Sequence, residues 1–159
     1  MIDVKFATSL QIMLSLALAE DEGVPLLTSH QLASSLGAHA ALVRTLMVPL
    51  VQNGLVRSLK GKAGGVTLAK APSDITLAAI YRSSTGEKKL LAARVDIPKK
   101  CLVSSNIMSF FDDIADEAEA AILTALSGRT LAGSLEELKR RHQADLILGQ
   151  SDKKVTASG

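Results

Sequence analysis

Apolar positions recur at helical spacing near the N-terminus of the chain. Between residues 3 and 21 they return every three or four positions, and additional apolar side chains widen the same surface. This pattern predicts a helix that is buried on more than one side. A short acidic run closed by Gly23 marks the predicted end of this helix.

A second periodic segment begins at Thr28. Gln31 follows three positions later, the spacing at which each side chain caps the backbone N–H of the other residue. Apolar residues share one face over 32–36, Gly37 interrupts the run, and an apolar face resumes over 43–46. Two short helices joined by a glycine turn predict a helix-turn-helix.

Alternating apolar and polar positions follow directly. Residues 55–59 alternate, residues 61–65 form a glycine-rich turn, and residues 66–68 alternate again, which predicts a β-hairpin. A hairpin after a helix-turn-helix is a wing. The turn lacks the GxxxxGK[ST] order of a nucleotide-binding loop, so a wing tip whose glycines let the backbone approach a groove is the better interpretation.

The C-terminal half predicts a long helix. Thr76 is positioned to cap a short helix that ends near residue 84, and residues 85–103 lack periodicity and are rich in Lys and Arg. From Ser104 or Ser105 as a cap, apolar residues then recur at helical spacing for about twenty residues. This stripe predicts a two-fold homodimer through Ile107, Phe110, Phe111, Ile114, Ala118, Ala121 and Ala125.

The last segment predicts a second, short helix. Ser134 and Glu137 repeat the capping-box spacing, and the chain is polar beyond Gly149. The predicted fold is therefore mainly α with a small β-hairpin wing. It comprises a winged helix-turn-helix DNA-binding domain at 1–84, a loop at 85–103, dimerisation helices at 104–148 and a disordered tail at 149–159.

Charge is distributed unevenly along the chain. The formal net charge is only +2, but no Asp or Glu occurs from Gly23 to Ser73. Arg44, Arg57, Lys60, Lys62 and Lys70 lie in this acid-free stretch. A one-sided basic segment of this kind suits a DNA phosphate backbone.

Several phrases resemble the Rrf-two (Rrf2) family of bacterial winged-helix regulators, which includes IscR, NsrR and CymR. They are Lys5-Phe6-Ala7, the wing phrase at 64–69, the D-I-T-L segment at 74–77 and the C-L-V-S-S-N-I stretch at 101–107. The resemblance covers roughly residues 1–143. It implies a dimeric regulator, more often a repressor, of a near-palindromic DNA operator, with backbone contacts near Lys5 and Thr8.

Two features depart from that family. Pro49 stands inside the second helix of the motif, where a proline removes one hydrogen bond and should bend or end the helix. Iron–sulfur members carry three clustered cysteines, whereas this chain has one. A cluster needs about four ligands, mostly thiolates, so we expect no cofactor and no metal.

The first residues of a recognition helix reach base edges in helix-turn-helix docking. His39, Ala40, Ala41 and Arg44 occupy those positions, although a solvated helix start would carry similar residues. The complete predicted DNA-contact set is Lys5, Thr8, Thr28, His39, Ala40, Ala41, Arg44, Arg57, Lys60, Lys62, Gly64 and Gly65.

Cys101 is the candidate sensor residue. A single cysteine is more often a small packed side chain, but Lys99, Lys100 and the helix that follows would favour its thiolate. Both interpretations stay open. The carboxylates of the long helix, at residues 112–119, fit a solvated face better than a metal site.

Other functional classes find less support. No nucleophile with a base and an orienting group is apparent, so an enzyme is not expected. A winged helix used for protein contacts would not need an acid-free stretch, and a regulator that responds to a small ligand remains an alternative. The longest apolar run, at 12–19, is too short to span a bilayer, and we expect a cytoplasmic protein without membrane contact.

Overall fold

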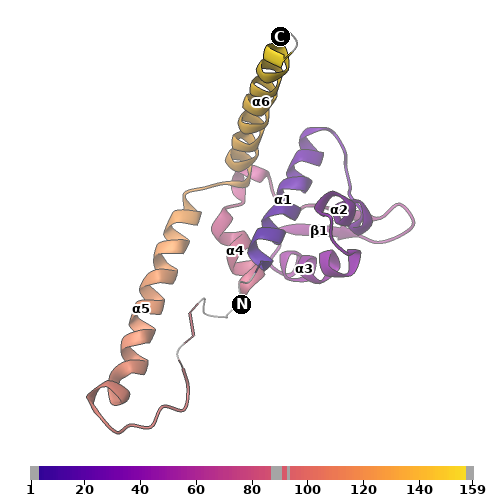
Figure 1. The fold of residues 1–159 in the computed structure, drawn as a ribbon. Coiled ribbons are helices and arrows are strands. Elements are labelled where there is room, and N and C mark those ends of the chain that lie inside the picture. The colour runs from indigo at the N-terminus through magenta and orange to yellow at the C-terminus, as the bar shows by residue number, and fades with distance from the viewer. Residues whose placement is uncertain (1–3, 87–90, 93, 157–159) are drawn as a thin grey trace.

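The computed structural model describes residues 4–86, 91–92 and 94–156. Its elements in chain order are α1 (Lys5–Asp21), α2 (Ser29–Leu36), α3 (Ala40–Gln52), β1 (Val56–Leu59), β2 (Gly65–Leu68), the 3-10 turn η1 (Pro72–Asp74), α4 (Leu77–Thr85), α5 (Leu102–Ser127) and α6 (Leu131–Thr156). The first four helices and the hairpin form one body; α5 lies beside it, and most of α6 projects beyond it (Figure 1). The predicted fold class, mainly α with a small wing, is confirmed.

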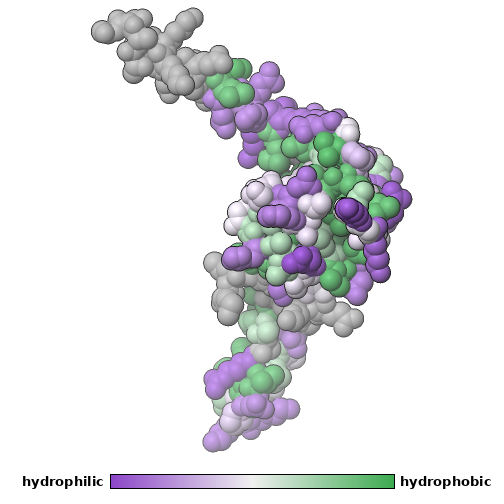
Figure 2. Space-filling model, turned by 90° about the vertical axis from the view of Figure 1, so that its right-hand side faces the viewer, coloured by the Kyte–Doolittle hydropathy of each residue, from purple (hydrophilic) through white to green (hydrophobic). Residues whose placement is uncertain are grey.

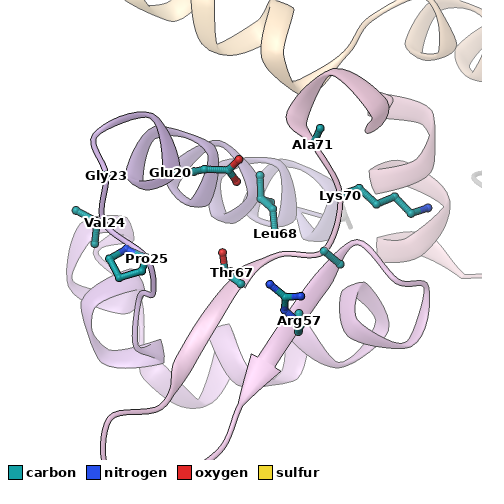
Figure 3. Close-up of a pocket in the computed structure, with 10 residues that line it drawn as sticks. Glu20, Gly23, Val24, Pro25, Arg57, Thr67, Leu68, Lys70 and Ala71 are labelled. Carbon is teal, nitrogen blue, oxygen red and sulfur yellow. The ribbon is translucent and has the colours of Figure 1, made fainter.

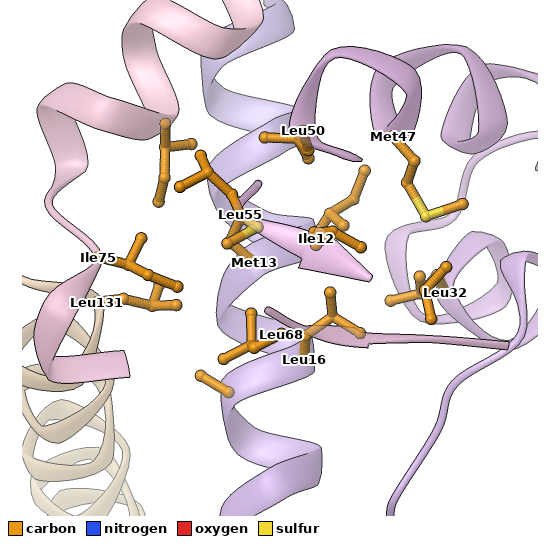
Figure 4. Close-up of a cluster of buried hydrophobic side chains, with 14 of the residues drawn as sticks. Ile12, Met13, Leu16, Leu32, Met47, Leu50, Leu55, Leu68, Ile75 and Leu131 are labelled. Carbon is orange, nitrogen blue, oxygen red and sulfur yellow. The ribbon is translucent and has the colours of Figure 1, made fainter. Parts of the chain in front are cut away.

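Helix α1 is the centre of the hydrophobic core. Ile12 and Met13 are completely buried, and Leu16 is nearly so. Helices α2, α3, α4 and α6 and strand β2 all pack against this helix (Figure 4). Much of the apolar surface predicted for residues 3–21 is therefore buried within a single subunit, although Leu18 stays 38% exposed.

The C-terminal helices are joined to this core through the α5–α6 junction. The Leu131 N–H donates to the Ile75 carbonyl at 2.8 Å, and the Leu77 N–H donates to the Arg129 carbonyl at 2.9 Å. Ile75 and Leu131 are both completely buried, and Leu135 adds a further apolar contact. The first turns of α6 thus belong to the core of the winged domain and not to a separate unit.

Helix α3 differs from the expectation at Pro49. The helix does not end there but continues to Gln52, with Pro49 in its last turn. The carbonyl of Pro49 still receives the Asn53 N–H at 3.0 Å and the Asn53 side-chain amide at 2.8 Å. A proline lacks a donor but keeps its acceptor, so the chain can close the turn beyond it.

Both C-terminal helices begin earlier than expected. Helix α5 starts at Leu102 with Cys101 as its N-cap, so neither Ser104 nor Ser105 is the cap. Helix α6 starts at Leu131, and Ser134 lies inside it with its hydroxyl donating to the Thr130 carbonyl at 2.8 Å. The predicted capping box at Ser134 is wrong because Thr130 accepts from the Gly133 N–H instead, at 3.1 Å.

The last helix is also longer than expected. Helix α6 extends to Thr156 through most of the segment predicted to be disordered, and residues 157–159 lie outside the described chain. Within the described residues, no single helix is long and apolar enough to cross a membrane, and α2 and α3 meet the criteria of length and composition only as a pair bent by 112°.

Candidate nucleic-acid interface

Helices α2 and α3 form the helix-turn-helix that the spacing predicts. Thr28 and Gln31 make the reciprocal capping box, with the Thr28 N–H donating to Gln31 Oε1 at 2.8 Å. Gly37 ends α2 with φ of +62°, a left-handed conformation that glycine adopts without steric cost. The bend of 112° between the helices lies in the range of helix-turn-helix motifs.

The start of α3 exposes most of the predicted base-facing set. His39 is the N-cap, but its side chain makes no capping hydrogen bond. The side chains of His39, Ala41 and Arg44 are exposed, whereas Ala40 packs against the core. The structure therefore brings three of the four predicted residues to one surface.

The exposed face of α3 continues beyond those residues. Thr45 and Val48 follow Ala41 and Arg44 at spacings of four, Gln52 follows Val48, and all three are exposed. Val48 has 53% of its surface exposed. The sequence analysis missed these residues, although their i+4 spacing could have indicated them.

Two of the predicted contact residues use their hydroxyls locally. Thr8 donates to the Val4 carbonyl at 3.0 Å, and the Thr28 hydroxyl is held in the capping box. Lys5 lies at the start of α1 with its side chain exposed. Of these three residues, Lys5 therefore has the side chain best suited to a phosphate contact.

The wing presents cations at two places. Lys60 and Lys62 are exposed in the turn between β1 and β2. Arg57 lies further from this turn, opposite Thr67 in the hairpin register. There it lines a shallow hollow of about 420 Å³ together with Glu20 (Figure 3). Lys70 lines the same hollow, so the hollow carries charges of both signs, whereas Lys60 and Lys62 stand exposed in the turn.

Internal packing explains the two wing glycines. A Cβ on Gly64 would stand 2.3 Å from the Leu59 carbonyl oxygen, and one on Gly65 would stand 2.8 Å from the Leu27 carbonyl oxygen. Leu27 pairs with strand β2 through hydrogen bonds of 2.8 and 3.0 Å to Val66. Both glycines are thus required by close backbone approach within the wing, so their presence does not by itself indicate a groove contact.

The predicted apolar stripe of α5 lies largely on the surface. Of the 26 residues of α5, all of them described, only Ala115 is buried. Phe110 is 61% exposed and Ile114 is 44% exposed, whereas Phe111 is half-buried. Hydrophobic side chains appear among hydrophilic ones at the lower end of the molecule, where α5 begins (Figure 2).

Cys101 caps the first turn of α5 with its side chain exposed. The Ser104 N–H donates to Sγ at 3.5 Å, and the Ser104 hydroxyl lies 3.4 Å from Sγ. Hydrogen bonding to the Ser104 side chain, then to the backbone of Ser104 and Val103, lowers the pKa of the Cys101 thiol. The pKa is thus lowered by hydrogen bonds at the helix start, and Lys99 and Lys100 are not among the causes.

Comparisons with known proteins agree with this architecture. YwnA of Bacillus subtilis, an HTH-type transcriptional regulator by name, is 23% identical over 138 residues, which cover 87% of this chain and 99% of YwnA. An rrf2-like regulator of Rhodobacter capsulatus is 29% identical over 123 residues, covering 77% of this chain and 76% of that protein.

Solved structures share the fold at lower identity. A transcriptional regulator from Lactobacillus plantarum superposes with a TM-score of 0.74 at 19% identity, covering 96% of this chain and 99% of its own. CymR of Bacillus subtilis gives a TM-score of 0.60 at 24% identity, covering 86% of this chain and 97% of the CymR chain. A family model described as "Rrf2, iron-dependent transcriptional regulator" matches residues 2–137. Because this model matches most of the chain, the chain belongs to the Rrf2 family of transcriptional regulators.

Proposed function

We propose that the protein is a cytoplasmic homodimer that binds a near-palindromic operator in double-stranded DNA and represses transcription there. The exposed face of α3, which begins with His39, Ala41 and Arg44, carries this proposal. It lies in a stretch of 51 residues, 23–73, without a carboxylate, and the wing lysines belong to the same stretch. DNA recognition requires base-reading side chains flanked by cations for phosphates.

The surface of α5 supports the proposed dimer. A helix with large exposed apolar side chains such as Phe110 and Ile114 is stabilised when a second copy covers them. Two-fold symmetry makes one patch complementary to itself, and it also matches the two halves of a palindrome. The α5 stripe therefore supports both the oligomeric state and the form of the operator.

The roles of two cations provide the test. Arg44→Ala should change which sequences are enriched from a random duplex library, with a loss of about 1–3 kcal/mol on sites whose guanine it reads. Lys62→Ala should weaken binding to all duplexes alike, because a contact to phosphate carries no base information. If Arg44→Ala enriched the same sequences with undiminished discrimination, Arg44 would not be a base-reading residue.

The family description does not extend to a metal in this chain. An iron–sulfur cluster needs about four ligands, mostly thiolates, but the sequence contains one cysteine. Among the described residues, no three His, Cys, Asp or Glu side chains come together to hold a metal ion. The donor set does not fit iron, and we propose regulation that does not use it.

Cys101 is the proposed redox-sensitive residue. Its lowered pKa places more thiolate at neutral pH than an ordinary cysteine has, so alkylation of the thiol should have its midpoint at a lower pH than that of an ordinary cysteine. Ser104→Ala should raise that midpoint because it removes the largest cause of the shift, whereas Ser105→Ala should not. The rate of reaction with iodoacetamide, measured between pH 6 and 9, gives the midpoint for the wild type and for each variant.

The regulatory effect has a separate readout. Mild oxidation should alter operator affinity in the wild type but not in Cys101→Ser, because sulfenic acid or a mixed disulfide would add polarity or bulk where α5 begins. Equal affinities with and without oxidant would remove Cys101 from regulation.

A small-ligand response is the alternative that a specific feature favours. A hollow of about 540 Å³ lies between α1 and α6, with Leu14, Leu18, Leu135 and Leu138 in its wall. Its volume falls in the range of small-molecule sites. Oxidant-insensitive operator binding would favour this alternative over the cysteine.

A further inference from the structure

Pro49 creates a structural problem near the end of α3. A proline has no N–H, so the Thr45 carbonyl one turn earlier receives no backbone donor from it, and the ring crowds that carbonyl. Even so, α3 continues for three residues beyond Pro49. The last turn of the helix therefore benefits from support outside the helix.

One hydrogen bond to this last turn comes from α4, and it reaches the carbonyl of Pro49 and not that of Thr45. The hydroxyl of Ser83 donates to the Pro49 carbonyl at 3.0 Å, across 34 positions of sequence. Two other donors, the backbone and side-chain amides of Asn53, reach the same oxygen from the end of α3. Of the donors to this carbonyl in the described chain, Ser83 alone comes from another element, and it is only 4% exposed.

Ser83 differs from the residues that follow it. The hydroxyls of Ser84 and Thr85 both donate to the Tyr81 carbonyl at 2.9 Å, inside their own helix. Such back-bonding is the usual use of a hydroxyl in a helix. Ser83 instead donates its hydroxyl to a carbonyl of α3. Its hydrogen bond therefore joins α4 to α3.

We infer that Ser83 is a positioning residue for DNA reading. It holds the last turn of α3 on α4 and thereby sets the orientation of the exposed face that starts at Ala41 and Arg44. Helix α4 also packs against α5, so it lies between α3 and the helix that carries the proposed dimer interface. The inference rests on the proposed function, because orientation matters only if α3 reads bases.

The test compares Ser83→Ala with two matched variants. Ser84→Ala removes a hydroxyl from the same helix, and Asn53→Ala removes a side-chain donor from the same carbonyl, but neither breaks the link between α3 and α4. Each variant is measured against a duplex enriched by the wild type and a scrambled duplex of equal length, at one salt concentration. Melting temperature and amide exchange at Asn53 are measured in parallel.

Ser83→Ala should bind the enriched duplex roughly tenfold more weakly, about the loss of one base contact, while its affinity for the scrambled duplex stays unchanged. Phosphate contacts dominate binding to the scrambled duplex, and they depend little on the tilt of α3. The Asn53 amide should also exchange faster in Ser83→Ala than in Ser84→Ala. Ser84→Ala and Asn53→Ala should discriminate between the enriched and the scrambled duplex as well as the wild type does.

Three results would overturn the inference. Undiminished discrimination by Ser83→Ala, or unchanged exchange at Asn53, would show that the hydrogen bond does not position α3. Equal weakening on both duplexes with a lower melting temperature would show a general loss of stability. A wild type without any preference among duplexes would refute the proposed function first, and the inference with it, so the two failures are distinguishable.

Discussion

Ile114→Asp should convert the protein to a monomer and lower its affinity for operator DNA by about 100-fold or more. Ile114 lies on the exposed stripe of α5, one turn after Phe110. In the proposed dimer each copy would bury a carboxylate against its symmetry mate, and burying an unpaired charge costs several kcal/mol. In a dimer, binding of one winged helix-turn-helix domain raises the effective concentration of the other domain at its half-site. Separated subunits lose that gain.

The control for this variant is on the same helix. Ala120→Asp introduces the same charge at an exposed position of α5 outside the predicted stripe, next to residues that are already acidic. It should leave both the dimer and the operator affinity unchanged. Sedimentation at micromolar concentration measures the oligomeric state. A dimer that persists in Ile114→Asp would exclude this stripe as the interface.

Raising the salt concentration from 50 to 200 mM should lower DNA affinity by a factor on the order of 10³ to 10⁵. The estimate assumes that a dimer neutralises roughly six to ten phosphates, each of which releases condensed counterions on binding. The proposed cations in each subunit are Lys5, Arg44, Arg57, Lys60 and Lys62.

Single variants separate these contributions. Lys60→Ala and Lys62→Ala should each reduce the slope of log affinity against log salt by about two per dimer. Arg140→Ala provides the control, since Arg140 lies on α6 and pairs with Glu137. A flat salt response of the wild type would contradict the proposed DNA contact altogether, whatever the variants showed.

The sequence by itself determined the parts of the fold that have local causes. Thr28, Gln31 and Gly37 define α2 because capping and a left-handed turn depend on residues within four positions of each other. The hairpin and the stripe of α5 also follow from spacing alone. The acid-free stretch and the first exposed residues of α3 were accessible in the same way, so most of the candidate interface could be predicted.

Tertiary structure decided what depends on partners far along the chain. The start of α6 is set by backbone pairing with residues 75–77, which no local pattern around Ser134 reveals. Gly65 is needed because the carbonyl of Leu27, 38 positions earlier, approaches it. Helix α3 continues past Pro49, whose carbonyl accepts from Ser83 of α4. A proline is locally a helix terminator, and it is tolerated here where distant residues complete the packing and hydrogen bonding of the turn that contains it.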